Sequence, residues 1–215
     1  MKKDVKLSNS AVTIGLNGAS YERMKEILEE IALKKILDGN MSACRYIVDK
    51  YKDYVYNIAF RICKNNEEAE EAAQDSFMKA FGALKDFNFK SKFSTWLYRI
   101  AFNTAISRTR AAKFFTNMAD YPFEDSRFAV GDLGNGIEQM AADEKRKLVR
   151  DALAALPGED ALLINLYYDY DHNFNEIASI TGLTVENVKV RMHRIRKKIL
   201  HHLSLKLKNE INDLI

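Results

Sequence analysis

The 215-residue chain is poor in the residues that interrupt helices or cross-link small folds, with 2 prolines, 9 glycines and 2 cysteines. The two thiols, Cys44 and Cys63, are too few for a disulfide framework, and their spacing fits no C-x-x-C metal knuckle. No apolar run approaches the roughly 20 residues of a membrane helix. The apolar stretch at 11–16 is too short and interrupted for a secretion signal. We therefore expect a cytoplasmic protein with reduced thiols and no membrane insertion.

Apolar residues recur at three- and four-residue steps through most of the chain, which is typical of amphipathic helices. We expect a long helix over about 42–63, a second helix with Asn66 as its N-cap, and a third capped by Ser94. The stretch 32–37 supplies a first helix for this bundle. No strand-type alternation persists, and a hydrophobic content of 47% excludes wholesale disorder. The fold class is therefore all-α.

Charge is distributed in blocks, although the formal net charge is only +3. The segment 67–86 carries six acids and two lysines, and 87–115 carries six bases and no acid. Seven acids and one arginine fall within 116–144, whereas 185–208 has eight bases and one acid. Two basic surfaces separated by an acidic stretch are an unusual layout for a chain that is nearly neutral as a whole.

The acidic stretch also breaks the helical pattern. It contains Pro122, and further along three glycines (Gly131, Gly134 and Gly136) fall within six residues. Its apolar residues show no sustained helical or strand period. This composition is typical of a flexible linker. The helical pattern resumes near Lys145, stops at Pro157 and Gly158, and continues with a further helix.

The segment 174–198 has the most specific pattern in the chain. A short helix containing Ile177 and Ala178 is followed by a turn at Gly182, and Thr184 caps a second helix. Glycine accommodates the positive φ that such a tight turn requires. This layout is that of a helix-turn-helix, whose second helix enters the major groove of DNA.

Four apolar residues at helical spacing would face inward from the second helix: Val188, Met192, Ile195 and Ile199. The opposite face then presents Glu186, Lys189, Val190, His193, Arg194 and Lys197, while Arg191, Arg196 and Lys198 flank it. Bases suit guanine edges and phosphates, and an apolar side chain suits a thymine methyl group. The alternative is an ordinary solvated face on a terminal helix.

Three stretches in this order resemble the sigma-70 family of RNA polymerase sigma factors, and most closely its small extracytoplasmic-function (ECF) group. The residues 93–105 (FSTWLYRIAFNTA) resemble the core-helix signature, and 68–77 (EAEEAAQDSF) resemble the acidic polymerase-binding helix. The residues 154–178 and 188–194 resemble the family's C-terminal helix-turn-helix. The resemblance implies two small helical domains joined by a flexible acidic linker.

The resemblance also implies the domain boundaries. Residues 1–29 would be an N-terminal extension, 30–112 sigma region 2, 113–145 the linker and 146–208 sigma region 4. In relatives the linker threads the interior channel of the polymerase, although a plain polar tether is an equal alternative. Met24, Ile27, Leu28 and Ile31 indicate an added amphipathic helix in the extension. That helix would pack on the first domain or regulate it.

In this family the N-terminal domain binds core RNA polymerase and captures non-template bases of the −10 promoter element. The resemblance assigns polymerase binding to Glu70, Glu71, Gln74 and Asp75, whose alternative role is a solvated helix face. It assigns −10 binding to Lys90, Lys92, Trp96, Arg99, Asn103, Ser107 and Arg110. Bases, Asn and aromatic rings suit a single strand and a flipped base, but Trp96 is as readily a core residue.

The −35 element would be read by Lys189, Val190, Arg191, His193, Arg194 and Lys197. Relatives commonly have Gly-Thr where Glu186-Asn187 stand here and Ser where Val190 stands, so their −35 preference does not transfer. The resemblance implies core RNA polymerase, promoter DNA and an anti-sigma factor as partners.

No enzymatic site is evident in the sequence. There is no phosphate-cradling glycine loop and no metal-ligand spacing, and we expect neither a cofactor nor a metal. His201 and His202 are adjacent, so they point in different directions, whereas a ligand pair on a helix needs i, i+4 spacing. The alternative function is a stand-alone helix-turn-helix regulator with a helical dimerisation domain. That alternative leaves the basic helix and the acidic linker without a role.

Overall fold

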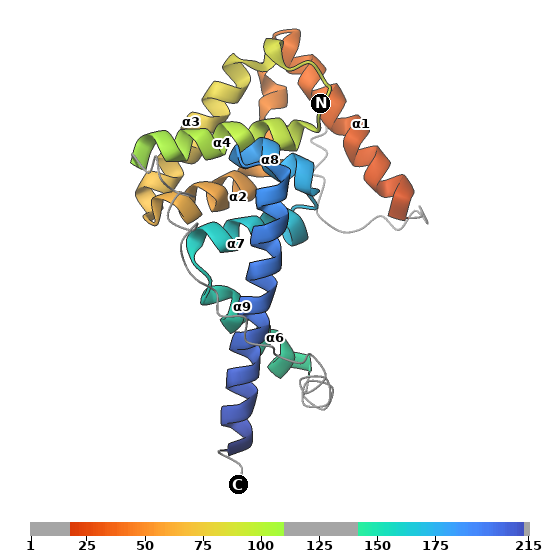
Figure 1. Cartoon of the computed structure of the whole chain (residues 1–215). Coiled ribbons are helices and arrows are strands. Elements are labelled where there is room, and N and C mark those ends of the chain that lie inside the picture. Colours follow the sequence, from red (N-terminus) through yellow and green to blue (C-terminus); the bar gives the residue numbers. More distant parts are fainter. Residues whose placement is uncertain (1–17, 110–141, 213–215) are drawn as a thin grey trace, which may run out of the picture. The chain divides into compact units, whose positions relative to one another are not determined.

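The computed structural model describes residues 18–109 and 142–212, and all regular structure within them is helical (Figure 1). The all-α expectation is confirmed. In chain order the elements are α1 (Gly18–Leu37), the 3₁₀ turn η1 (Met41–Ala43), α2 (Cys44–Cys63), α3 (Asn66–Gly82), the 3₁₀ turn η2 (Leu84–Asp86), α4 (Phe93–Thr109), α6 (Ala142–Ala154), α7 (Gly158–Ile164), the π-helical turn η4 (Asn165–Asp169), α8 (Phe174–Thr181) and α9 (Val185–Asn212). Among the helices of these residues, none has the length and apolar content needed to span a bilayer.

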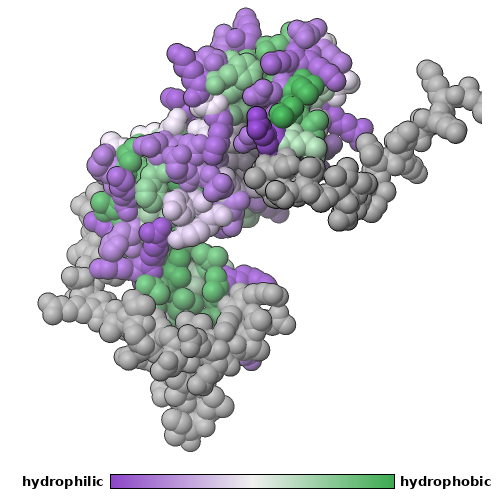
Figure 2. Space-filling model, turned by 90° about the vertical axis from the view of Figure 1, so that its right-hand side faces the viewer, coloured by the Kyte–Doolittle hydropathy of each residue, from purple (hydrophilic) through white to green (hydrophobic). Residues whose placement is uncertain are grey.

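By its contacts the chain divides into two compact units, Met1–Lys50 and Tyr51–Ile215. In the first unit α1 is one continuous helix, so the predicted extension helix and the helix expected at 32–37 are the same element. It buries Ala32, Leu33 and Ile36 and leaves exposed the apolar stripe predicted in the extension. Hydrophobic patches of this kind lie among a mainly hydrophilic surface (Figure 2).

The first half of the second unit is built on the packing of α3 against α4. The inner face of α3 is rich in alanine: Ala69, Ala72 and Ala80 are completely buried. Small side chains let the two backbones approach closely. From α4, Leu97 and Ala101 are equally buried, so the polar faces of both helices point to solvent.

The predicted N-cap of α3 is corrected by one residue, and the predicted start of α4 by two. The N-cap of α3 is Asn65, whose side chain accepts a hydrogen bond from the backbone N–H of Glu68 at 3.0 Å, and Asn66 is the first helical residue. Asn65 and Asn66 have the same side chain, so the sequence does not distinguish which of them is the N-cap. The backbone conformation of Asn65 assigns that role to it. α4 begins at Phe93 rather than after Ser94, because the backbone N–H of Trp96 already bonds to the carbonyl of Lys92.

The C-terminal half of the second unit is organised around α9, whose 28 residues span about 42 Å at 1.5 Å per residue. Its later turns hold α6 through a cluster of Leu148, Ala152 and Leu203. The ion pair between Lys206 Nζ and Asp151 Oδ2, at 2.7 Å, joins the same two helices. Its first turns pack on α7 and α8. This packing fixes which face of α9 remains open.

Candidate nucleic-acid interface

The turn between α8 and α9 has the geometry that the sequence predicts for a helix-turn-helix. Gly182 has a φ of 74°, and its N–H donates to the carbonyl of Ala178 at 2.9 Å. Thr184 Oγ1 accepts a hydrogen bond from the N–H of Asn187 at 3.2 Å and so caps α9. The left-handed conformation is favourable for glycine, which lacks a Cβ. The predicted turn and cap positions are both confirmed.

The start of α8 is fixed by a capping box that the sequence analysis did not identify. The side chain of Asn173 accepts from the N–H of Glu176 at 3.1 Å, and the Glu176 carboxylate accepts from the N–H of Asn173 at 2.8 Å. The spacing of an N-cap residue followed three positions later by glutamate is the signal that would have found it. α8 therefore begins at a defined residue before the turn.

The predicted inward stripe of α9 is buried. Val188, Met192 and Ile195 are at most 1% exposed, and Ile199 is half-buried. The opposite face is open to solvent: Lys189, Val190, His193 and Arg194 are exposed, and Lys197 is half-buried. The sequence prediction of a basic outer face with one apolar side chain therefore agrees with the burial of each residue.

Two of the flanking bases have partners inside the domain. Lys198 Nζ lies 2.7 Å from Oδ2 of the fully buried Asp160 on α7. Arg196 donates from Nε to the hydroxyl of Tyr168 at 3.2 Å. These contacts anchor α9 to α7 and η4, a role that the sequence pattern alone did not indicate.

Arg191 lies between the buried and the open faces of α9 and is half-buried. Burial lowers the pKa of its guanidinium, while the Asp160 and Glu159 carboxylates oppose that shift. Its charge is thus already associated with α7. Of the six residues assigned to −35 binding, Arg191 and Lys197 are half-buried and the other four are exposed.

On α4 the predicted polar stripe is also on the surface. Arg99, Asn103 and Ser107 are exposed, and they lie opposite the buried face of the helix. Ser107 Oγ donates to the carbonyl of Asn103 at 2.8 Å, so this hydroxyl is already engaged with its own helix. Arg110 lies outside the described residues.

Trp96 has features of both of its alternative roles. It is half-buried, and its ring centroid lies 5.2 Å from that of Phe87 and 5.7 Å from that of Phe93. These distances are those of packed aromatic pairs. The indole is therefore anchored to the bundle while part of it remains accessible.

The two lysines of the loop before α4 differ in their surroundings. Lys90 is exposed, and its backbone N–H donates to Asn88 Oδ1 at 3.1 Å. Lys92 Nζ lies 3.2 Å from Glu176 Oε1 on α8. Lys90 thus faces solvent beside α4, whereas Lys92 forms an ion pair with Glu176 of the helix-turn-helix.

The acidic face of α3 is open but not wholly unpaired. Glu70, Glu71 and Gln74 are exposed and Asp75 is half-buried. Arg108, near the end of α4, forms ion pairs with Glu71 and with Asp75 Oδ2, the second at 2.8 Å. Arg108 was not among the predicted site residues, because it lies one position away from Ser107 and therefore off the polar stripe of α4.

The described residues contain no cluster of three or more His, Cys, Asp or Glu side chains placed to hold a metal ion. The geometry is that of two exposed helical surfaces, α9 with its basic face and α4 with its polar stripe, on one chain. Exposed basic and polar helix faces are suited to contact with nucleic acid. The fold and these surfaces define a two-part DNA-binding protein.

Comparisons with known proteins identify the family. The family model for sigma-70 region 2 matches residues 47–115, and that for sigma-70 region 4 matches 146–199. The chain is 32% identical over 185 residues to the ECF RNA polymerase sigma factor SigW of Bacillus subtilis, covering 81% of this chain and 96% of that protein. It is 29% identical over 172 residues to the RNA polymerase sigma-H factor of Pseudomonas aeruginosa, covering 78% and 89%.

Among solved structures, CnrH in complex with the cytosolic domain of CnrY is similar, with a TM-score of 0.55, 22% identity and coverage of 83% of this chain and 98% of CnrH. This likeness shows the shared fold. The chain belongs to the ECF group of sigma-70 RNA polymerase sigma factors. It is accordingly a transcription initiation factor that directs RNA polymerase to promoters.

Proposed function

We propose that this sigma factor binds core RNA polymerase through α3 and reads a two-part promoter through α4 and α9. The single observation that carries the assignment is the open basic face of α9 opposite its buried apolar stripe, with the start of the helix set by the Gly182 turn. The functional division we propose is region 2 at 30–112, the linker at 113–145 and region 4 at 146–208. Residues 1–29 remain outside this division.

At the −35 element, the first turns of α9 enter the major groove. Lys189, His193, Arg194 and Lys197 then supply donors for guanine edges and phosphates, and the exposed Val190 meets a thymine methyl group. Arg191 contributes at the edge of this surface. Because Val190 is apolar, we expect discrimination for thymine at one position of the element.

At the −10 element, α4 holds the non-template strand after the bases unstack. Arg99 and Lys90 bind its backbone, and the amide of Asn103 hydrogen-bonds a flipped base edge. The accessible part of Trp96 provides a stacking platform. Ser107, Arg110 and Lys92 complete the surface assigned to this strand.

At the polymerase, the acids of α3 pair with basic side chains of the enzyme. Glu70 and Gln74 are exposed on this face, while Arg108 orients Glu71 and Asp75. Charged pairs at such an interface set orientation and association rate more than affinity. Neutralising Glu70 is therefore expected to slow binding to the polymerase.

The protein acts in the cytoplasm, where its polymerase and promoter DNA are found, and it is not an enzyme, because phosphoryl transfer belongs to the polymerase. It needs no cofactor or metal. We further propose an anti-sigma factor as its regulator. The fold that it shares with CnrH, whose structure contains the cytosolic domain of CnrY, supports this proposal.

Polymerase dependence tests this function against the alternative of a stand-alone repressor. Fluorescence anisotropy with a labelled two-element promoter is measured with and without core polymerase. We expect tight, specific binding only in the presence of core enzyme. Binding to a palindromic duplex by a dimer of this chain alone, with no gain from the polymerase, would support the repressor instead.

A further inference from the structure

Asp160, in the first turn of α7, is a buried acid that the proposed function does not use. The residue is 0% exposed. Its Oδ2 lies 2.7 Å from Lys198 Nζ on α9, whereas its Oδ1 has no hydrogen-bond partner among the residues that the structure describes. A buried ion pair gives little net stability, because desolvation offsets much of the attraction. A half-satisfied carboxylate in this place is therefore a poor choice for stability alone.

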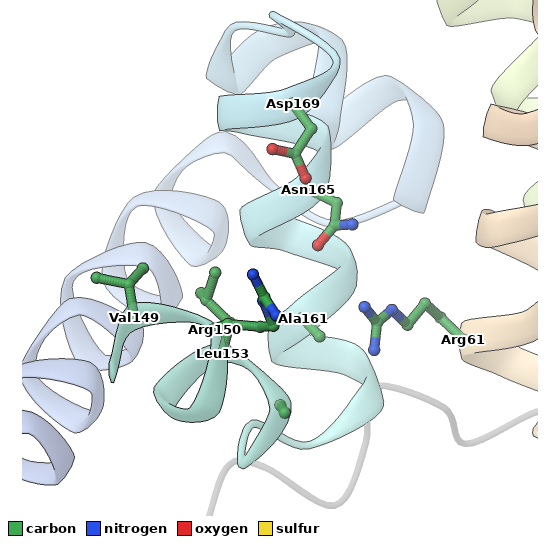
Figure 3. A pocket seen from close by; sticks show the side chains of 8 residues that line it. Arg61, Val149, Arg150, Leu153, Ala161, Asn165 and Asp169 are labelled. Atoms are coloured by element: carbon green, nitrogen blue, oxygen red, sulfur yellow. The ribbon is translucent and has the colours of Figure 1, made fainter. Parts of the chain in front are cut away.

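The orientation of α7 directs this carboxylate toward α9. Ala161, Asn165 and Asp169 follow one another at four-residue steps along α7 and η4, and they line an open cleft of about 730 Å³ (Figure 3). Asp160 lies outside this row, and its ion pair with Lys198 places it on the side of α7 that packs on α9. The carboxylate is therefore held between two helices and does not face the cleft.

The side of α9 that meets α7 carries two bases with an apolar residue between them. Arg191, Ile195 and Lys198 recur at steps of four and three residues, so they lie on one face of the helix. Ile195 is 1% exposed, and the two bases are half-buried. Arg191 therefore lies two turns before the residue that is paired with Asp160, at about 10 Å along the helix axis.

The charge of Arg191 is coupled to the acids at the start of α7. Burial lowers the pKa of its guanidinium, whereas the Asp160 carboxylate, and after it that of Glu159, raises this pKa. Arg194, which is exposed on the open face of α9, lowers the same pKa by repulsion. Charges interact more strongly in a partly buried site than in water, because the effective dielectric constant is lower. Attraction by α7 and repulsion by Arg194 thus both favour a guanidinium that stays beside α7.

We propose that Asp160 is a positioning residue that keeps Arg191 and Lys198 away from the DNA backbone, by offering them an internal carboxylate in place of a phosphate. The exposed bases Lys189 and Arg194 then make the main contacts with DNA, and the contribution of Arg191 at the edge of the surface is limited. Because phosphate contacts are independent of sequence, Asp160 lowers the sequence-independent affinity of α9. This inference rests on the proposed function of α9 as the helix that reads the −35 element.

Asp160→Asn tests the proposal, because the amide keeps the shape of the side chain and removes its charge. Arg191 and Lys198, once released, should reach phosphates, and each contact steepens the slope of log binding constant against log salt concentration by about 0.9. We expect a slope steeper by about 0.9 to 1.8. Fluorescence anisotropy measures it for the full-length protein bound to core polymerase, on a labelled promoter selected from a library by run-off transcription. An unchanged slope in Asp160→Asn would overturn the proposal.

Asp151→Asn is the matched control for the change in net charge. Asp151 Oδ2 pairs with Lys206 Nζ at 2.7 Å, the same distance as in the pair of Asp160 and Lys198. Lys206 lies eight residues beyond Lys198, or about 12 Å further along α9. Its release should therefore change the salt slope by much less than about 0.9. An equal steepening in Asp151→Asn and Asp160→Asn would assign the effect to net charge and overturn the proposal.

Two further measurements identify the residues and the kind of contact. Adding Arg191→Gln to Asp160→Asn should remove about 0.9 of the added slope. If neither Arg191→Gln nor Lys198→Gln removed any of it, the proposal would be overturned. The steepening should persist on a promoter whose −35 element is scrambled, since phosphates carry no sequence information. A steepening confined to the intact −35 element would indicate base contacts and contradict the proposal.

Lysine acetylation of the wild-type protein tests the proposal even if Asp160→Asn reduces the helix content measured by circular dichroism. Mass spectrometry compares the polymerase complex with and without promoter DNA. Lys189 should be protected by the promoter, whereas Lys198 should react equally in both samples, as Lys206 does. Lys206 is the internal standard, because its side chain is 38% exposed and that of Lys198 is 37% exposed. Protection of Lys198 as strong as that of Lys189 would overturn the proposal.

These measurements separate the role of Asp160 from a purely structural one and from the proposed function. Loss of packing around α9 would weaken DNA binding at every salt concentration and would not steepen the slope. Equal binding of the intact and the scrambled promoter by the wild-type complex would overturn the proposed −35 function. Discrimination by the wild-type complex together with an unchanged slope in Asp160→Asn would overturn the role of Asp160 alone.

Discussion

Replacing Gly182 is expected to destabilise the helix-turn-helix through backbone conformation alone. At a φ of 74° an alanine incurs about 1–2 kcal/mol of strain. Alanine also stiffens the unfolded chain, which offsets about 0.4–1 kcal/mol of that cost. No atom lies within 4 Å of the added Cβ, so no clash contributes, and the net loss for Gly182→Ala is about 1 kcal/mol.

Urea unfolding of the full chain, followed by circular dichroism, measures this loss. Gly182→Asn is the informative partner, since asparagine tolerates the left-handed region better than alanine, and it should lose less than half as much. Gly82→Ala, at an ordinary backbone conformation, should cause no comparable loss. If Gly182→Asn were as unstable as Gly182→Ala, or if Gly182→Ala were as stable as wild type, the reasoning from backbone strain would be wrong.

Two further predictions concern charge. Burial lowers the pKa of His172 below its ordinary 6.5, although the Glu176 carboxylate opposes the shift. The folded chain is therefore fully stable above pH 6.5, where this imidazole is neutral, and it loses stability as the pH falls through the lowered pKa. His172→Gln should remove that step from the free energy of unfolding, measured in urea between pH 8 and 5.5. If the step survived in this variant, it would belong to another group. The second prediction concerns binding of the −35 duplex by the polymerase complex. If Lys189 contacts one phosphate, Lys189→Gln should reduce the slope of log binding constant against log salt concentration by about 0.9. An unchanged slope would show that Lys189 does not contact the DNA backbone. The charged groups near His172 are Glu176, Asp171 and Lys92, and Tyr98 and Thr95 pack on it from α4.

Local signals in the sequence were sufficient for the helix-turn-helix. Gly182 and Thr184 act through backbone conformation and a neighbouring N–H, so their roles follow from a few adjacent residues. The buried stripe of α9 follows from helical spacing in the same way. The N-cap of α3 was displaced by one residue and the start of α4 by two, because neighbouring positions compete as helix starts and tertiary packing selects one of them.

Contacts between distant segments could not be read from local patterns. Arg108 pairs with Glu71 and Asp75 across 33 or more positions, and nothing in the spacing of either segment indicates this partner. Gly158 is a similar case: a Cβ added there would lie 2.8 Å from the backbone carbonyl oxygen of Arg61, although the sequence shows only an ordinary first helical residue. Likewise, the burial of His172 depends on a surface of α4 that lies 77 positions away.

Run-off transcription with purified core polymerase and a promoter library tests the central claim most directly. We expect initiation that requires this protein and is lost in both Asn103→Ala and Arg194→Ala, while circular dichroism shows that each variant is still folded. Arg194→Ala should fail at promoter recognition, whereas Asn103→Ala should fail at strand opening. Permanganate, which reacts with unpaired thymines, shows whether the promoter strands have opened and so distinguishes the two defects. Core-dependent initiation with unchanged output from both variants would contradict the assignment of the two DNA surfaces.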